Sequence, residues 1–186
     1  DHSGGSVSSA GDLNGDGFND LVIGARFGDS DALNSGESYV VFGKSRGFAA
    51  VLSLASLDGN NGFRLDGIDA GDNAGSSVSG AGDVNGDGFD DLIIGAIYGD
   101  TNDIDSGECY VVFGRSGSFA SALNLSSLDG TNGFRLNGIY VQNQAGGSVS
   151  KAGDVNGDGF DDLIIGAMRA HAGGNGRGES YVVFGK

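Results

Sequence analysis

Short apolar runs, separated by polar and glycine-rich segments, set the pattern of hydrophobic positions along this 186-residue chain. The runs Leu21-Val22-Ile23, Leu92-Ile93-Ile94 and Leu163-Ile164-Ile165 are rich in β-branched residues, which is typical of buried strands. A fourth run, Tyr110-Val111-Val112-Phe113, is apolar on both faces, so a strand here must be covered from two sides. No stretch keeps a 3.6-residue apolar period. The pattern therefore predicts an all-β protein.

The pattern repeats at a fixed interval of 71 residues. Residues 36–43 recur at 107–114 and 178–185, and residues 52–68 recur at 123–139. One unit predicts about four strands, which in the second unit lie at residues 76–80, 92–96, 108–113 and 133–139, with a possible extra piece at 123–128.

Units of about four strands that stack face to face predict the blades of a β-propeller, each a four-stranded antiparallel sheet. A calcium-binding β-helix is the competing fold, but its repeats are near nine residues long. We expect one repeat domain over residues 1–186, with blades at approximately 1–71, 72–142 and 143–186, the last one incomplete. Because propellers usually close with about 4–8 blades, we expect the ring to be completed by head-to-tail oligomerisation, a homodimer being favoured, or by the rest of a longer parent chain.

An acidic loop of nine residues precedes each of the three β-branched runs. The sequence Asp-Val-Asn-Gly-Asp-Gly-Phe-Asp-Asp occurs at 83–91 and 154–162, and a near copy stands at 12–20. Oxygen ligands from positions 1, 3, 5 and 9 and from the backbone carbonyl at position 7 suit Ca²⁺, which takes about 6–8 oxygens in flexible geometry. No cysteine or histidine lies in the loops, so zinc and copper are poor candidates. We predict about three Ca²⁺ per chain, held by Asp12, Asn14, Asp16, Phe18, Asp20, Asp83, Asn85, Asp87, Phe89, Asp91, Asp154, Asn156, Asp158, Phe160 and Asp162.

The loops have two other possible interpretations. Asp, Asn and Gly are also the usual residues of turns that bind no metal. An EF-hand requires a bidentate Glu at position 12 and flanking helices. Position 12 is Ile23, Ile94 or Ile165, inside a predicted strand, so the loops are not those of an EF-hand.

The matching motif residues of the second unit are Gly75, Val78, residues 81–88, residues 91–96 and residues 107–113. With these residues, which recur in every unit, the chain resembles the FG-GAP repeats of the integrin α-subunit propeller and of related bacterial surface proteins. The resemblance implies a propeller fold and Ca²⁺ bound by the acidic loop between strands of a blade.

The chain departs from the family pattern at two positions of each unit. Ser3, Ala74 and Ala145 replace the phenylalanine of Phe-Gly, and we expect Phe63 and Phe134 to supply the missing core volume. Arg26, Ile97 and Met168 replace the proline of Gly-Ala-Pro, which leaves the loop after that strand less rigid.

The charge balance narrows the class of partner. The chain has 25 acidic and 10 basic residues and a net charge of −15, which disfavours binding to nucleic acid or insertion into an anionic membrane. Cys109 is the single cysteine, so no disulfide forms within the chain. Calcium loops of weak to moderate affinity work best where Ca²⁺ is near millimolar, which predicts an extracellular or cell-surface location.

These observations favour a non-catalytic, calcium-binding propeller module for cell-surface adhesion or protein assembly. No nucleophile–base constellation is recognisable, and we predict neither catalytic residues nor an organic cofactor. Partners are expected to be the chain itself, the rest of a longer chain, a surface protein or a glycan, recognised by the variable segments 26–35, 97–106 and 168–177. A carbohydrate-binding propeller, with Phe27, Tyr98 and Tyr140 as loop aromatics, and a propeller-borne hydrolase or lyase are the alternatives.

Overall fold

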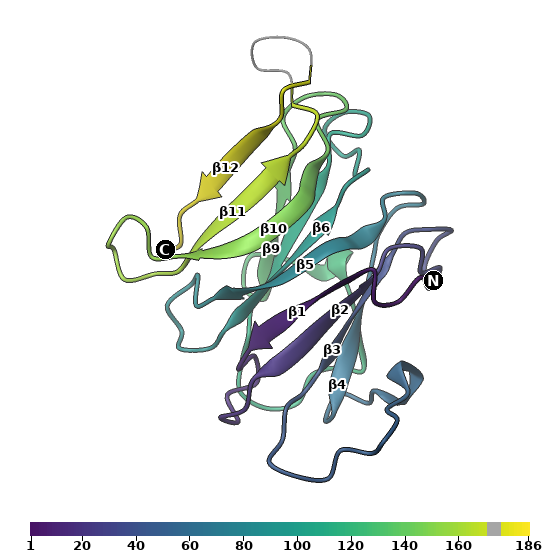
Figure 1. Ribbon diagram of the computed structural model, residues 1–186, viewed down its shortest axis with the longest axis vertical. Coiled ribbons are helices and arrows are strands. Elements are labelled where there is room, and N and C mark those ends of the chain that lie inside the picture. Colours follow the sequence, from purple (N-terminus) through teal and green to yellow (C-terminus); the bar gives the residue numbers. More distant parts are fainter. Residues whose placement is uncertain (171–175) are drawn as a thin grey trace.

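Three small β-sheets lie side by side in the computed structural model, which describes residues 1–170 and 176–186 (Figure 1). Their strand orders are β1-β2-β3-β4-β8, β5-β6-β7-β9 and β10-β11-β12. The all-β prediction and the prediction of propeller blades are confirmed. The strands are β1 (Ser6–Gly11), β2 (Asp20–Ala25), β3 (Glu37–Val41), β4 (Gly62–Asp66), β5 (Ala74–Gly82), β6 (Asp91–Ala96), β7 (Glu108–Val112), β8 (Ala122–Asn124), β9 (Gly133–Asn137), β10 (Ala145–Gly153), β11 (Asp162–Ala167) and β12 (Glu179–Val183), with short 3-10 helices η1 (Leu54–Ser56) and η2 (Leu125–Ser127).

Strands β1 to β4, β5 to β9 without β8, and β10 to β12 each form an antiparallel meander, and the register repeats from unit to unit. In the second sheet, Ile94 of β6 lies opposite Val78 of β5 and Tyr110 of β7. In the described residues, the third sheet has the three strands β10, β11 and β12. Residues 171–175, in the third variable segment, lie outside the described residues.

The extra piece predicted at 123–128 joins the sheet of the preceding unit. Strand β8 pairs in parallel with β4, so that Leu123 lies opposite Leu65. The backbone N–H of Arg64 on the outer edge of β4 donates to the carbonyl of Ser121 at 3.0 Å. The segment that connects β7 to β9 therefore crosses from the second blade to the first.

Two apolar seams hold the three sheets together. The first seam packs Val22 and Val40 of the first sheet against Val78 and Leu92 of the second. The second seam packs Ile93 and Val111 of the second sheet against Leu163 and Ile165 of the third. Along β7, Tyr110 and Val112 face the first seam while Cys109 and Val111 face the second. This arrangement confirms that the strand with two apolar faces is covered from both sides.

Glycine permits a close approach of backbones at each seam. A Cβ atom on Gly95 would lie 2.1 Å from the carbonyl oxygen of Gly146, so no other residue fits there without displacing the next blade. Ala74, which replaces the family phenylalanine, is buried in the same core cluster as Phe63. Phe134, the equivalent of Phe63 in the second unit, is only half-buried.

Candidate metal centres

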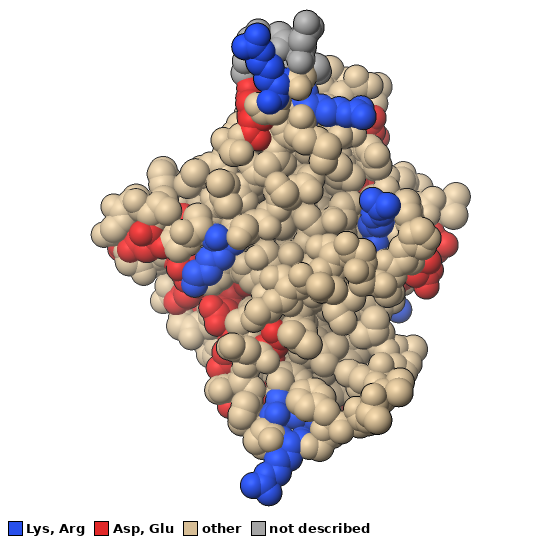
Figure 2. Space-filling view, viewed as in Figure 1, with Lys and Arg blue, Asp and Glu red and all other residues tan. Residues whose placement is uncertain are grey.

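The three acidic loops lie on the same side of the molecule. They connect β1 to β2, β5 to β6 and β10 to β11, and all three are at the left in Figure 1. Figure 2 shows acidic side chains gathered along this edge. Each loop leads directly into a strand that begins at its ninth residue, Asp20, Asp91 or Asp162, as the sequence predicted.

Positions 1, 3 and 5 of each loop are connected by a repeated set of hydrogen bonds. In the second loop, the Asp83 carboxylate accepts from the N–H groups of Asp87 at 3.1 Å and Gly88 at 2.9 Å. The Asn85 side-chain oxygen accepts from the Asp87 N–H at 2.9 Å, and its amide nitrogen donates to the Asp87 carboxylate at 3.0 Å. The Phe89 N–H donates to the Asp87 carboxylate at 3.0 Å. The first and third loops repeat these bonds, so three chemically equivalent loops have one conformation.

Position 9 is buried and fixes the loop to the body of the blade. The Asp91 carboxylate is fully buried and accepts from the N–H groups of Val84 at 3.0 Å and Gly114 at 2.8 Å. Burial raises the pKa of Asp91 to about 7, and the Asp87 and Asp83 charges add to this, while the two N–H donors oppose it. Burial likewise raises the pKa of Asp20 to about 6. The ninth carboxylate therefore lies where a neighbouring positive charge would be favourable.

The donor set of each loop fits Ca²⁺, because it contains only carboxylate, amide and backbone oxygens. Among the described residues, however, no group of three or more His, Cys, Asp or Glu side chains is arranged as a metal-binding cluster. Hydrogen bonds to backbone N–H groups bring the side chains at positions 1, 3 and 5 together. The carboxylate at position 9 lies beside them because it accepts a hydrogen bond from the N–H of the residue at position 2. Calcium binding by the fifteen predicted residues stays a prediction.

The phenylalanine at position 7 contacts the neighbouring loop. A Cβ atom on Gly15 would lie 2.4 Å from the Phe89 ring, and one on Gly86 would lie 2.3 Å from the Phe160 ring. Each ring therefore covers a glycine of the preceding loop. Phe18, which has no preceding loop in this chain, is exposed.

Sequence reasoning missed two carboxylates at position 8 that connect the loops. The Asp90 carboxylate accepts from the N–H of Asp12 at 2.8 Å, and the Asp161 carboxylate accepts from the N–H of Asp83 at 3.0 Å. Asp161 also pairs with Lys151 at 2.7 Å. The first loop has Asn19 at this position. This difference between otherwise similar loops was the signal in the sequence that could have pointed to position 8.

The recurring glutamates form a structural pair in each blade. The Tyr110 hydroxyl donates to the Glu108 carboxylate at 2.5 Å, and Glu108 also accepts from the Thr101 N–H at 3.0 Å. Glu37 pairs with Tyr39 in the same way, and the Tyr181 hydroxyl donates to Glu179 at 2.5 Å. The glutamate therefore holds the same structural position in each of the three blades.

The chain belongs to the FG-GAP repeat family. The family model matches residues 3–41, 74–112 and 145–183, each of which covers the first three strands of one sheet and one acidic loop. The resemblance drawn from the sequence motifs is thereby confirmed.

Proteins of two kinds are similar to the chain. It is 32% identical over 162 residues to integrin alpha-PS5 of Drosophila melanogaster, which covers 87% of this chain and 14% of that protein. It is 30% identical over 165 residues to integrin alpha-5 of Xenopus laevis, covering 86% of this chain and 14% of that protein. It is also 32% identical over 170 residues to phosphatidylinositol-glycan-specific phospholipase D of Bos taurus, covering 90% of this chain and 19% of that protein. The chain thus spans less than a fifth of the length of these relatives.

Proposed function

We propose that this chain is a non-catalytic, calcium-binding β-propeller module that serves adhesion or protein assembly at a cell surface or outside the cell. The observation that supports this most is the geometry of the acidic edge. Three equivalent loops lie on one side of the blade stack and are connected by Asp90 and Asp161. The similarity to integrin α subunits supports the adhesion class.

Calcium would act on the loops by neutralising charge. In the second loop Asp83, Asn85, Asp87, Asp91 and the Phe89 carbonyl would hold the ion. Each loop places three ligand carboxylates, at positions 1, 5 and 9, within nine residues, and their mutual repulsion is relieved by a divalent cation. Because position 9 is anchored at the end of β7 through Gly114, an ion bound there would also tie the loop to the blade.

The proposed location outside the cell follows from the same loops, since open loops of this kind suit millimolar Ca²⁺. No helix in the described part of the chain is long and apolar enough to span a bilayer. Integrin α subunits are cell-surface proteins, and the similarity to them favours a location at the cell surface.

A second candidate function is a role within a larger enzyme. The observation that favours it is the 32% identity to phosphatidylinositol-glycan-specific phospholipase D. In that case the module would bind or position the substrate, while the reaction would take place in another part of a longer protein. Assays of the isolated chain with a panel of lipid, ester and glycoside substrates separate the two, because a non-catalytic module predicts no turnover. A glycan array tests the carbohydrate-binding alternative in parallel.

We further propose that the two outer faces of the stack bind additional blades, either of a second copy in a head-to-tail dimer or of a longer polypeptide. On the outer face of the third sheet, Val182 is 46% exposed, whereas the equivalent Val111 is fully buried in a seam. On the opposite outer face, Val7 is 65% exposed, whereas the equivalent Val78 is buried. The two outer faces therefore correspond to the two sides of a seam between neighbouring blades.

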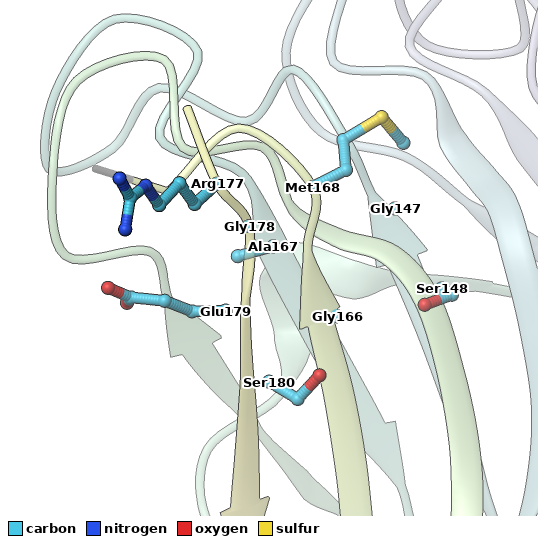
Figure 3. Close-up of a pocket in the computed structure, with 9 residues that line it drawn as sticks. All are labelled: Gly147, Ser148, Gly166, Ala167, Met168, Arg177, Gly178, Glu179 and Ser180. Atoms are coloured by element: carbon cyan, nitrogen blue, oxygen red, sulfur yellow. The ribbon is translucent and has the colours of Figure 1, made fainter. Parts of the chain in front are cut away.

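The outer face of the third sheet retains the shape that receives a neighbouring blade. A hollow of about 460 Å³ lies over Gly166, between Ser148 and Ser180 (Figure 3). Gly24 and Gly95 hold the equivalent place in the first two sheets, and there the backbones of Gly75 and Gly146 fill it. The three atoms nearest to a Cβ on Gly166 all belong to Ser148 of its own sheet.

Thermal unfolding with and without calcium tests the proposed role of the ion. A ligand that binds only the folded state stabilises it by about 2.7 kcal/mol per site at 100 times its dissociation constant. We expect EDTA to lower the melting temperature markedly and Ca²⁺, but not an equal concentration of Mg²⁺, to restore it. An unchanged melting curve in EDTA would show that the loops are turns without a structural ion.

A further inference from the structure

A lysine lies at the contact between the second and third acidic loops. The ammonium of Lys151 lies 2.7 Å from the Asp161 carboxylate oxygen that accepts the N–H of Asp83 at 3.0 Å. Asp83 is position 1 of the second loop, so the ammonium lies one oxygen atom away from the backbone of a predicted Ca²⁺ ligand. A Cβ atom on Gly82, the preceding residue, would lie 2.5 Å from the same ammonium. The charge of Lys151 is therefore held at the start of the second loop.

The contact between the first and second loops has the same carboxylate without a cation. Asp90 accepts the N–H of Asp12 at 2.8 Å, which repeats the hydrogen bond between the second and third loops. No ion pair joins Asp90 to another residue in the described part of the chain. Gly80 stands 71 residues before Lys151, at the same place in the strand register. The ammonium is thus a charge that has no counterpart at the first of the two contacts.

The position of Lys151 matters for a bound cation more than for folding. The Lys151 and Asp161 side chains are 46% and 23% exposed, and ion pairs with this much exposure contribute little to stability. The ammonium, however, neutralises a carboxylate that would attract a cation into the second loop, and it repels a divalent ion directly. Salt screens such effects over about 8 Å at physiological ionic strength. Because the ammonium and the Asp83 N–H contact one oxygen atom, they lie closer together than this.

We propose that Lys151 tunes the second acidic loop, holding its Ca²⁺ affinity below the value that its ligands alone would give. This inference rests on the proposed function, because it takes the loop to bind Ca²⁺, and it extends that function to a residue outside the ligand set. Lys151 acts on the ion through its charge and through Asp161, which contacts the backbone of a ligand. Groups that contact a ligand commonly alter metal affinity in this way.

Calorimetry on single-site variants isolates the second loop. Asp16→Ala combined with Asp158→Ala removes position 5 of the first and third loops and leaves the second loop to bind one Ca²⁺. In this background Lys151→Gln, which keeps most of the stem and removes the charge, should raise the Ca²⁺ affinity about three- to tenfold at low salt. The reverse background, Asp87→Ala combined with Asp158→Ala, leaves the first loop alone. There Lys151→Gln should leave the affinity unchanged.

Two further variants fix the sign and the location of the effect. Arg169→Gln is the matched control, since it removes one positive charge beyond Ala167, where β11 ends, whereas the acidic loop precedes the start of that strand. It should leave the affinity of the second loop unchanged within about twofold. Asp161→Asn keeps an oxygen for the Asp83 N–H but leaves the ammonium without its counter-charge. It should weaken Ca²⁺ binding to the second loop about threefold or more.

The salt dependence separates the charge of Lys151 from its packing. The screening length falls from about 30 Å in 0.01 M salt to about 3 Å in 1 M salt. The gain in affinity from Lys151→Gln should therefore shrink as salt is added over this range. A gain of the same size at both ends would mean that the charge of Lys151 is not its cause, and this would contradict the proposal.

Failure of this inference is distinguishable from failure of the calcium assignment. Absence of Ca²⁺ binding in both single-site backgrounds, with circular dichroism showing a folded chain, would refute calcium binding itself. Binding in both, with equal affinity of the second loop before and after Lys151→Gln, would refute the role of Lys151 alone. If a single-site variant does not fold without metal, Ca²⁺ titration of the melting temperature of the whole chain makes the same comparison. Lys151→Gln should then lower the Ca²⁺ concentration for half-maximal stabilisation, and Arg169→Gln should not.

Discussion

The carboxylate of Asp90 accepts a hydrogen bond of 2.8 Å from the backbone N–H of Asp12, the first residue of the acidic loop in the neighbouring blade. Asp90 itself belongs to the acidic loop of the second unit, so each loop stabilises the start of the one before it. Asp161 does the same for Asp83. The acidic loops are therefore joined to the seams between blades, and changes in one loop should be felt by the next.

Asp90→Ala should destabilise the protein by about 1–3 kcal/mol, because it leaves a partly buried N–H without its charged acceptor. Asn19→Ala is the matched control, since Asn19 holds the same loop position in the first unit, where no preceding loop is present in the chain. The control should change stability by about 0.5 kcal/mol or less. Urea unfolding in saturating Ca²⁺ measures both, and equal effects would show that the connection between loops is unimportant.

Phe119→Ala should cost about 3–5 kcal/mol, the range for removing a buried phenylalanine side chain. Phe119 is 7% exposed and packs on Phe63 and Phe42. The control is Phe48→Ala, which removes the equivalent but exposed side chain of the first unit and should cost about 0.5 kcal/mol or less. If the two variants unfold at the same urea concentration, the segment of residues 115–127 does not stabilise the first blade.

Asp72→Asn should raise stability at pH 8 and leave it nearly unchanged at pH 4. Burial, with the charges of Glu108, Asp100 and Asp69, raises the pKa of Asp72 from 3.8 to about 7, and Arg135 opposes this. Because the folded pKa lies above the unfolded one, the contribution of Asp72 is fully favourable below about pH 4 and is lost as the pH rises through 7. The difference between the two pKa values corresponds to a gain at pH 8 of at most about 4 kcal/mol.

Asn143 stands at the equivalent position of the third unit, so an amide is compatible with this place in the fold. Asp103→Asn is the control, since Asp103 is exposed and is not among the charges that act on Asp72, and it should show little dependence on pH. Urea midpoints measured between pH 4 and pH 8 decide the matter. A gain from Asp72→Asn that is as large at pH 4 as at pH 8 would mean that the charge of Asp72 is not the cause.

Gly107→Ala should be far more destabilising than Gly178→Ala. Both glycines have a left-handed φ, so both substitutions carry the same backbone cost of about 1–2 kcal/mol. A Cβ atom on Gly107 would also lie 2.1 Å from the Ala145 carbonyl oxygen, whereas on Gly178 the nearest atom is 3.3 Å away. If the outer face of the third sheet binds another blade, Gly178→Ala should also reduce the mass measured by light scattering. Equal unfolding midpoints for the two variants would argue against tight packing at the seam.

Repetition made most of the blade architecture predictable from the sequence. The runs around Ile94 and Val111 located strands within a few residues, and the apolar character of both faces of β7 indicated two seams. The crossing of residues 115–127 to the first blade was not predictable, because residues 122–124 carry no signal that distinguishes pairing with β4 of the preceding blade from pairing within their own blade. Contacts of that kind depend on which sheet edge lies nearby in space.

The candidate metal site was likewise predictable only in part from the sequence. The side chains at positions 1, 3, 5 and 9 were identified from oxygen chemistry and spacing alone. The role of Asp90 was not, because a carboxylate at position 8 looks like one more acidic loop residue until the neighbouring blade places the Asp12 N–H against it. The burial of Asp91, which raises its pKa, likewise follows from packing rather than from local sequence.

Isothermal titration calorimetry with Ca²⁺ tests the calcium assignment most directly. The parent chain, stripped of metal with EDTA and dialysed, should bind about three Ca²⁺, one for each acidic loop. Asp87→Ala should lose one of these sites, and Asp69→Asn, which lies outside the loops, should retain all of them. Fewer than two sites in the parent chain, or a preference for Zn²⁺ over Ca²⁺, would contradict the assignment of the loops as calcium centres.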